Sequence, residues 1–186
     1  MLALAASFSK ALNPPAVLLL VIVLAGVKAG LGIIGVTALA LGIIAVPGIV
    51  YKKFPVLAMK LGLATSLRTK VVAALTLVGA LTCLILDVPG PVPATAMGLV
   101  VGNAGLALAR LRLNASAHVS VLTFAVSWSV AVFGGEFSWL LVLSPVMLVS
   151  RTVLREHTWG EALVGALIGI VTFGFFAEAN TWSWIT

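Results

Sequence analysis

Two histidines, His118 and His157, are the residues of this chain best suited to acid–base or nucleophilic chemistry. Each stands at the start of an apolar run. Glu161 follows His157 by four residues, so on a helix both side chains share one face and the carboxylate can hold the imidazole. Single His, Arg or Glu residues at a membrane surface are also common helix anchors. The joint placement of these groups with Arg151 predicts a phosphate site, because a guanidinium and a helix N-terminus both suit phosphate.

The composition indicates that these residues belong to a membrane protein. Of the 186 residues, 62% are hydrophobic and 9% are charged, and the mean hydropathy is +1.25. A soluble domain carries about 25% charged residues, so a chain this apolar cannot hide its side chains inside a water-soluble globule. Disorder is excluded as well, because low hydrophobicity is what keeps a chain unfolded. The continuous apolar runs predict an all-α, polytopic bundle of transmembrane helices that forms one domain over residues 1–186.

Turn signals divide the sequence into about six to seven predicted spans. Asn13 is a typical helix N-cap and Pro14 suits the first helical position. The segment before them carries a single charge, Lys10, and is unlike a cleaved signal peptide, so the first span is expected to be retained. The predicted spans are residues 14–29, 31–50, 71–86, 94–109, 117–133, 137–149 and 157–176.

The number of spans between charged segments assigns each segment to one of two sides. Segments 51–70, 110–116 and 150–156 return to the side of the N-terminus, here called side A. Ten of the eleven Lys and Arg residues fall on side A: Lys10, Lys52, Lys53, Lys60, Arg68, Lys70, Arg110, Arg112, Arg151 and Arg155. The opposite side B receives Lys28, Asp87, Glu136 and Glu178. The positive-inside rule therefore predicts that side A is cytoplasmic, and the net charge of +6 reflects topology and not a nucleic-acid partner.

Several polar, small and aromatic residues within the spans have structural interpretations. Asn103 is expected to form an interhelical hydrogen bond, and Gly165 with Gly169 forms a small-x-x-x-small pair typical of helix packing. Aromatic residues near the C-terminus indicate an interfacial belt on side B: Phe175, Phe176, Trp182 and Trp184.

The segment 114–170 resembles two motifs of the type 2 phosphatidic acid phosphatase superfamily. Ser150-Arg151-x5-His157-x3-Glu161 resembles its third motif, S-R-x5-H-x3-D. Ser116-Ala117-His118, one predicted hairpin upstream, is similar to its second motif, P-S-G-H, with alanine in place of proline and glycine. The first motif, K-x6-R-P, is matched only by Lys60-x7-Arg68-Thr69, which is one residue longer and lacks the proline.

The resemblance implies a metal-independent lipid phosphatase that works through a phosphohistidine and needs no cofactor. His157 would be the nucleophile, Glu161 would fix its tautomer, and His118 would protonate the leaving oxygen and then activate water. The residues implied to hold the phosphate oxygens are Arg151, Lys60, Arg68, Ser116 and Ser150.

The implied substrate is a phosphorylated lipid, either a prenyl mono- or diphosphate or a phosphatidate-type lipid. The Asn13-Pro14-Pro15 start is similar to that of small microbial members, so the cell membrane of a microbe is the expected location. A non-catalytic polytopic protein, such as a transporter or an assembly partner that binds anionic lipid through its side A cations, is the alternative.

Overall fold

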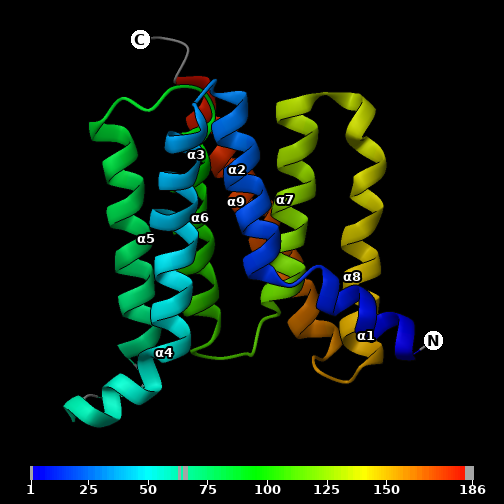
Figure 1. The fold of residues 1–186 in the computed structure, drawn as a ribbon. Coiled ribbons are helices and arrows are strands. Elements are labelled where there is room, and N and C mark those ends of the chain that lie inside the picture. The colour runs from blue at the N-terminus through cyan, green and yellow to red at the C-terminus, as the bar shows by residue number, and fades with distance from the viewer. Residues whose placement is uncertain (1, 63, 65–66, 183–186) are drawn as a thin grey trace.

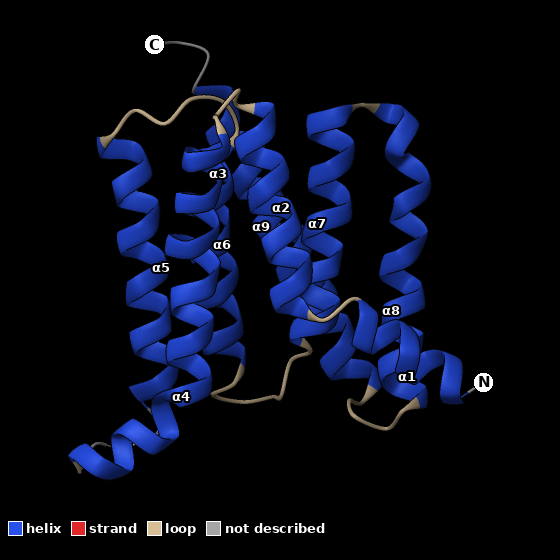
Figure 2. Ribbon diagram, viewed as in Figure 1, coloured by secondary structure: helices blue, strands red, loops and turns tan. Residues whose placement is uncertain are grey.

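The computed structural model describes residues 2–62, 64 and 67–182, and 85% of the chain is helical. No strand occurs in the described part of the chain, where short loops join the helices (Figure 2). The helices, including a π-helical segment (η1) and a 3₁₀ segment (η2), are α1 (Leu2–Ala11), α2 (Pro14–Lys28), α3 (Ile33–Leu39), η1 (Ala40–Ala45), α4 (Val46–Leu61), α5 (Leu67–Ile85), α6 (Val92–Ala109), α7 (Ala117–Phe133), η2 (Gly135–Val142), α8 (Leu143–Val153) and α9 (Trp159–Trp182).

Four helices of the described chain are long and apolar enough to cross a membrane, and α1 with α2, bent by 42°, makes a fifth if the pair is one span. The four are Ile33–Leu61, Val92–Ala109, Gly135–Val153 and Trp159–Thr181. The apolar stretches Lys70–Ile85 and Ala117–Phe133 are shorter. At 1.5 Å per residue they reach about 25 Å, less than the ~30 Å hydrocarbon core. The structure therefore supports a helical membrane bundle with four to five spans by length, fewer than the six to seven predicted.

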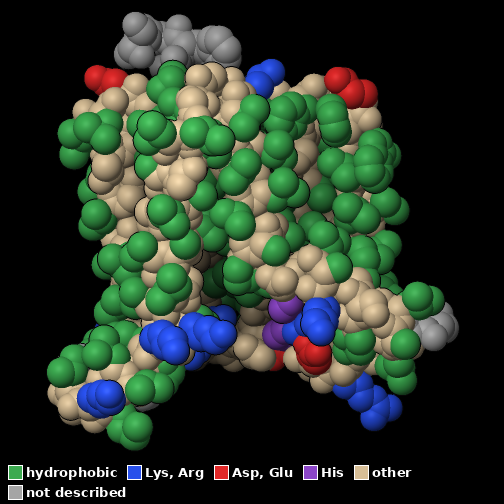
Figure 3. Space-filling view, in the orientation of Figure 1, with side chains coloured by type: hydrophobic (Ala, Val, Ile, Leu, Met, Phe, Trp, Pro, Cys, Tyr) green, Lys and Arg blue, Asp and Glu red, His purple; other side chains and the backbone are tan. Residues whose placement is uncertain are grey.

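The helices run along a common direction, except that α1 lies across one end and the last turns of α4 bend outward there (Figure 1). The loops 110–116 and 154–158 lie at the same end as α1. The loops 29–32 and 86–91 and the α7–η2 turn lie at the other end, near the end of α9 (Figure 1). This arrangement agrees with the predicted grouping of segments into sides A and B. Figure 3 shows Lys and Arg side chains gathered at the α1 end and apolar side chains over the flanks.

Helix α7 lies at the centre of the packing and contacts α2, α8 and α9. The largest fully buried side chains include Trp128 and Phe124 of α7 and Phe176 of α9. Phe176 meets the ring of Phe124 edge-on, with 6.4 Å between centroids. The prediction of an interfacial position for Phe176 is wrong, because its helix face points to α7 and not to lipid. Phe175, on the next face, is 41% exposed; the side chain of Trp182 and all of Trp184 lie outside the described residues.

Glycines allow α9 to approach α7 closely. A Cβ atom on Gly165 would lie 2.5 Å from the Ser116 carbonyl oxygen, and one on Gly169 would lie 2.4 Å from the Ser120 carbonyl oxygen. Real Cβ atoms do not approach so closely, so any side chain at these positions would push the helices apart. The predicted packing role of this glycine pair is confirmed. The close approach brings the start of α9 against the start of α7.

Candidate active site

The starts of α7 and α9 meet at the side A end and bring the two histidine motifs together. The Ser116 N–H, just before α7, donates a 3.2 Å hydrogen bond to the carbonyl oxygen of Glu161 in the first turn of α9. His118 follows in the first turn of α7. The ionisable groups whose charges reach its imidazole are Arg151, Glu156 and His157. Two segments about 40 residues apart in sequence thus form one cluster.

The Asn114 carbonyl oxygen holds the imidazole of His157. Nδ1 of His157 lies 2.9 Å from that oxygen. A carbonyl oxygen can only accept a hydrogen bond, so the proton is assigned to Nδ1 and the lone pair to Nε2. The side chain is 10% exposed. An imidazole that is largely shielded from solvent and held in this tautomer can use Nε2 as a nucleophile.

The carboxylate of Glu161 has a second role, as part of the N-cap of α9. Its Oε2 accepts a 2.8 Å hydrogen bond from the Thr158 N–H, while Thr158 Oγ1 accepts one of 3.3 Å from the Glu161 N–H. This reciprocal pair is a capping box. The same Oε2 lies 3.7 Å from Nδ1 of His157. Glu161 can therefore stabilise a positive imidazole by charge, whereas the hydrogen bond that orients the ring comes from Asn114.

Arg151 is 8% exposed and is held from two sides. Its Nη1 donates a 2.7 Å hydrogen bond to Ser9 Oγ of α1, and its Nη2 forms an ion pair with Glu156. Nε of Arg151 has no hydrogen-bond partner among the described residues. The guanidinium is thus fixed in place, and its Nε–H group is unused.

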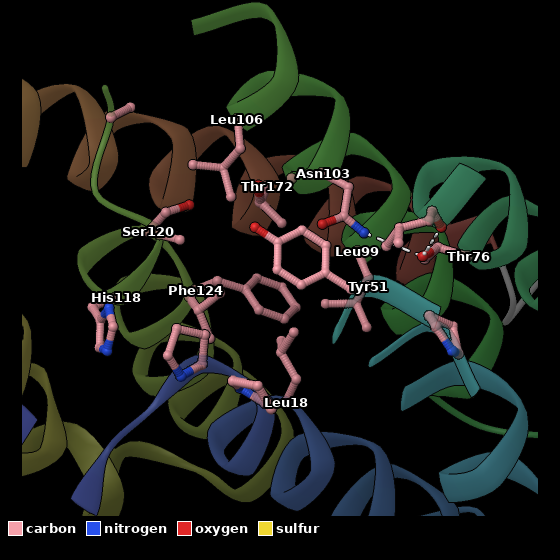
Figure 4. A pocket seen from close by; sticks show the side chains of 18 of the residues that line it. Leu18, Tyr51, Thr76, Leu99, Asn103, Leu106, His118, Ser120, Phe124 and Thr172 are labelled. Carbon is pink, nitrogen blue, oxygen red and sulfur yellow. Dashed lines mark hydrogen bonds between the residues drawn. The ribbon is translucent and has the colours of Figure 1, made fainter. Parts of the chain in front are cut away.

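A cavity of about 710 Å³ opens beside this cluster, between the α4–α5–α6 side of the bundle and the α2–α7–α9 side. Figure 3 shows the surface hollowed next to the histidine and basic side chains. The side A end of the cavity is polar and is lined by Arg110, Asn114, His118, Arg151, Glu156 and His157. The deeper part is mainly apolar, and Leu18, Leu99, Leu106 and Phe124 border it (Figure 4). The cavity is thus amphiphilic, with its charged end at the side A end of the bundle.

No family model, no curated protein and no solved structure matches this chain. What the site can do is therefore argued from its own residues. Among the described residues, no group of three or more His, Cys, Asp or Glu side chains could hold a metal ion.

The structure does not bring all the predicted phosphate ligands to the cavity. Lys60 is exposed in the last turn of α4. Arg68 donates a 2.6 Å hydrogen bond from Nη2 to the hydroxyl oxygen of Tyr51 and lies over that ring. Tyr51 lines the cavity, but Lys60 and Arg68 do not. The physical reason is that α4 continues to Leu61 and bends away from the bundle, which carries Lys60 outward.

The two predicted serines also lie outside the cavity wall. Ser150 donates a 2.7 Å hydrogen bond to the Val146 carbonyl oxygen of its own helix. Ser116 Oγ is fully buried and has no partner within the described part of the chain. Neither hydroxyl contacts the polar end of the cavity in this arrangement.

Three residues at the polar end of the cavity were not predicted as site residues: Arg110, Asn114 and Glu156. Arg110 was assigned to topology, because it follows a span directly. Glu156 precedes His157, and Asn114 lies two residues before Ser116. Their positions beside the two histidine motifs were the feature of the sequence that could have identified them. Only the packing of α6 against α9 brings Arg110 to the same cavity as the histidines.

Proposed function

We propose that this protein is a membrane-embedded, metal-independent lipid phosphatase that acts through a phosphohistidine. The observation that supports this proposal best is that two histidines lie at the basic end of an otherwise apolar cavity. The Nε2 atom of one of them, His157, carries a lone pair. The phosphate of a lipid would bind at that end and its chain would lie in the apolar part. The motif resemblance over residues 114–170 supports the same proposal.

The proposed reaction has two steps. Nε2 of His157 attacks phosphorus, and the bond from phosphorus to the lipid oxygen breaks. His118, whose protonated form the negative charge of the bound phosphate stabilises, gives its proton to that oxygen. His118 then takes a proton from water, the resulting hydroxide attacks phosphorus, and the phosphorus–nitrogen bond breaks to release inorganic phosphate. Glu161 stabilises the positive charge on His157 in the intermediate. Arg151 and Arg110 neutralise charge on the phosphate oxygens.

We also propose that Arg110 supplies the cation that the incomplete first motif lacks. It lies at the polar end of the cavity, whereas Lys60 and Arg68 do not. The substrate class is a lipid phosphomonoester or diphosphate, because a phosphate and a long apolar chain match the two ends of the cavity.

We propose seven crossings, in which the shorter α5 and α7 and the bent α1–α2 pair also span the bilayer. The side A end is proposed to face the cytoplasm of a microbial cell. Ten cations at that end support this orientation through the positive-inside rule.

The test is phosphate release by the purified full-length protein in detergent with EDTA, using phosphatidate, lysophosphatidate and prenyl phosphates as substrates. We expect turnover by the parent, and loss of both turnover and an acid-labile phosphoenzyme in His157→Ala. His157 sits at the membrane surface, so this variant should still fold. Equal release of phosphate by the parent and by His157→Ala would refute the mechanism.

A second function, binding of anionic lipid without hydrolysis, is favoured by one observation. Arg151 is already bound to Ser9 and Glu156, so a phosphate must compete with the Glu156 carboxylate for its guanidinium. The same assay separates the two functions, because a binding protein retains labelled lipid phosphate and releases none.

A further inference from the structure

The apolar part of the cavity contains a polar pair on two helices. Asn103 of α6 donates a 3.2 Å hydrogen bond from Nδ2 to Thr76 Oγ1 of α5, and both residues line the cavity. The predicted interhelical hydrogen bond of Asn103 is thus confirmed. Thr172 of α9 borders the same space (Figure 4). Polar side chains are costly within a membrane and commonly mark a functional site.

The hydrogen bonds of Thr76 decide which way the amide of Asn103 points. The Thr76 hydroxyl donates its proton to the Val72 carbonyl oxygen, at 2.9 Å. Its oxygen can then only accept, so Asn103 must present its NH₂ group to Thr76. The amide oxygen is left without a partner in the described part of the chain. Figure 4 shows this oxygen turned away from Thr76, on the cavity side.

The amide oxygen lines the cavity, so an occupant that displaces water from it costs free energy unless that occupant donates a hydrogen bond in place of the water. A hydrocarbon chain cannot do so, and neither can an ester, which only accepts. A hydroxyl or an amide N–H can. The chemistry of the Asn103 oxygen therefore selects an occupant that carries a hydrogen-bond donor.

The position of Asn103 along α6 indicates where on the lipid this hydrogen-bond donor lies. Asn103 precedes Arg110 by seven residues, which is about 10 Å of helix rise. The donor is therefore expected within about 10 Å of the phosphate, a range that includes the free hydroxyl of a lysophosphatidate and the hydroxyl and amide of a ceramide phosphate.

We propose that Asn103 is a specificity-determining residue that binds a hydroxyl or amide N–H next to the headgroup of a lipid phosphate. The substrate class is then a lysophospholipid-type or sphingoid-type phosphate, and not a prenyl phosphate or a fully acylated phosphatidate. This inference rests on the proposed function, and it narrows the substrate of the same cavity.

The test compares two ligands that differ in one hydroxyl: 1-oleoyl lysophosphatidate and its 2-deoxy analogue. Dissociation constants are measured with the full-length His157→Ala protein in detergent, so that neither ligand is consumed. We expect the hydroxyl ligand to bind about threefold to tenfold more tightly, the range of one neutral hydrogen bond. Equal affinities on this protein overturn the inference without any further substitution.

Substitutions test whether the Asn103 amide causes the preference for the ligand with the hydroxyl group. Asn103→Leu is expected to remove the difference between the two ligands, whereas Thr82→Val is expected to keep it. Thr82 is the matched control because it is on α5, bonds to its own helix as Thr76 does, and does not line the cavity. If Asn103→Leu still binds the hydroxyl ligand more tightly, then another group binds that hydroxyl and the inference is overturned. Failure of the proposed function is a different outcome. In that case the parent protein releases no phosphate, whatever the ratio of its affinities for the two ligands.

Discussion

Arg151 and Glu156 form an ion pair, and both side chains line the polar end of the cavity. The guanidinium is nearly buried, whereas the carboxylate side chain is 48% exposed. A phosphate that binds Arg151 must compete with this carboxylate and is also repelled by it. Glu156 therefore weakens anion binding at the site in the arrangement described.

Glu156→Gln is expected to lower KM for a lipid phosphate by roughly twofold to fivefold, the range of a solvent-exposed ion pair. The effect should shrink as salt is added, since salt screens exposed charges. KM is measured in detergent micelles, with Glu178→Gln at the opposite end of the bundle as the control. A rise in KM would mean that Glu156 positions Arg151 for substrate.

Glu161→Gln separates the two roles of this carboxylate. Glutamine also completes a capping box, so the variant should keep the melting temperature while losing the charge 3.7 Å from His157. We expect kcat to fall by about tenfold or more. Glu161→Ala should lower kcat and also cost about 1 kcal/mol of stability through the lost cap. Full activity of Glu161→Gln would leave only the capping role.

Gly169→Ala is expected to destabilise the protein, because the new methyl group would lie 2.4 Å from the Ser120 carbonyl oxygen. Overpacking of this kind costs about 1–3 kcal/mol. Gly174→Ala is the control on the same helix, since nothing lies within 4 Å of its Cβ position. Thermal melting in detergent compares the two variants. Equal melting temperatures would show that α9 does not pack against α7 as described.

Arg110→Ala tests which cation completes the phosphate site. Because Arg110 lines the cavity and Lys60 and Arg68 do not, we expect a loss of kcat/KM of at least tenfold for Arg110→Ala. The expected loss for Lys60→Ala is small. Steady-state hydrolysis of one lipid phosphate measures both variants. A large loss of kcat/KM for Lys60→Ala alone would show that Lys60 of α4, and not Arg110, supplies the cation of the first motif.

Cysteine labelling tests the proposed orientation. In a Cys83→Ala background, single cysteines replace Leu111 at the side A end and Leu86 at the side B end, both exposed in the structure. With side A in the cytoplasm, an impermeant maleimide should label intact cells at position 86 but label position 111 only after permeabilisation. The reverse pattern would invert the orientation and leave the chemistry of the site unchanged.

The sequence by itself determined the local features, because they depend on neighbouring residues. Asn13 accepts a 3.1 Å hydrogen bond from the Ala16 N–H and starts α2, as its type and position predict. The four-residue spacing of His157 and Glu161 keeps the two side chains close, with His157 in the loop just before α9 and Glu161 in the first turn of that helix. The apolar runs likewise predict helices, since a backbone in lipid must satisfy its own hydrogen bonds.

Only the tertiary structure decided which distant residues share the cavity. Arg110 and Lys60 are both basic residues beside a span, and nothing in their immediate sequence separates them. The packing of α6 against α9 brings Arg110 to the histidines, while the outward bend of α4 carries Lys60 away. The tautomer of His157 is set by a carbonyl 43 residues away, at Asn114. Such contacts depend on how helices cross, which composition and periodicity do not encode.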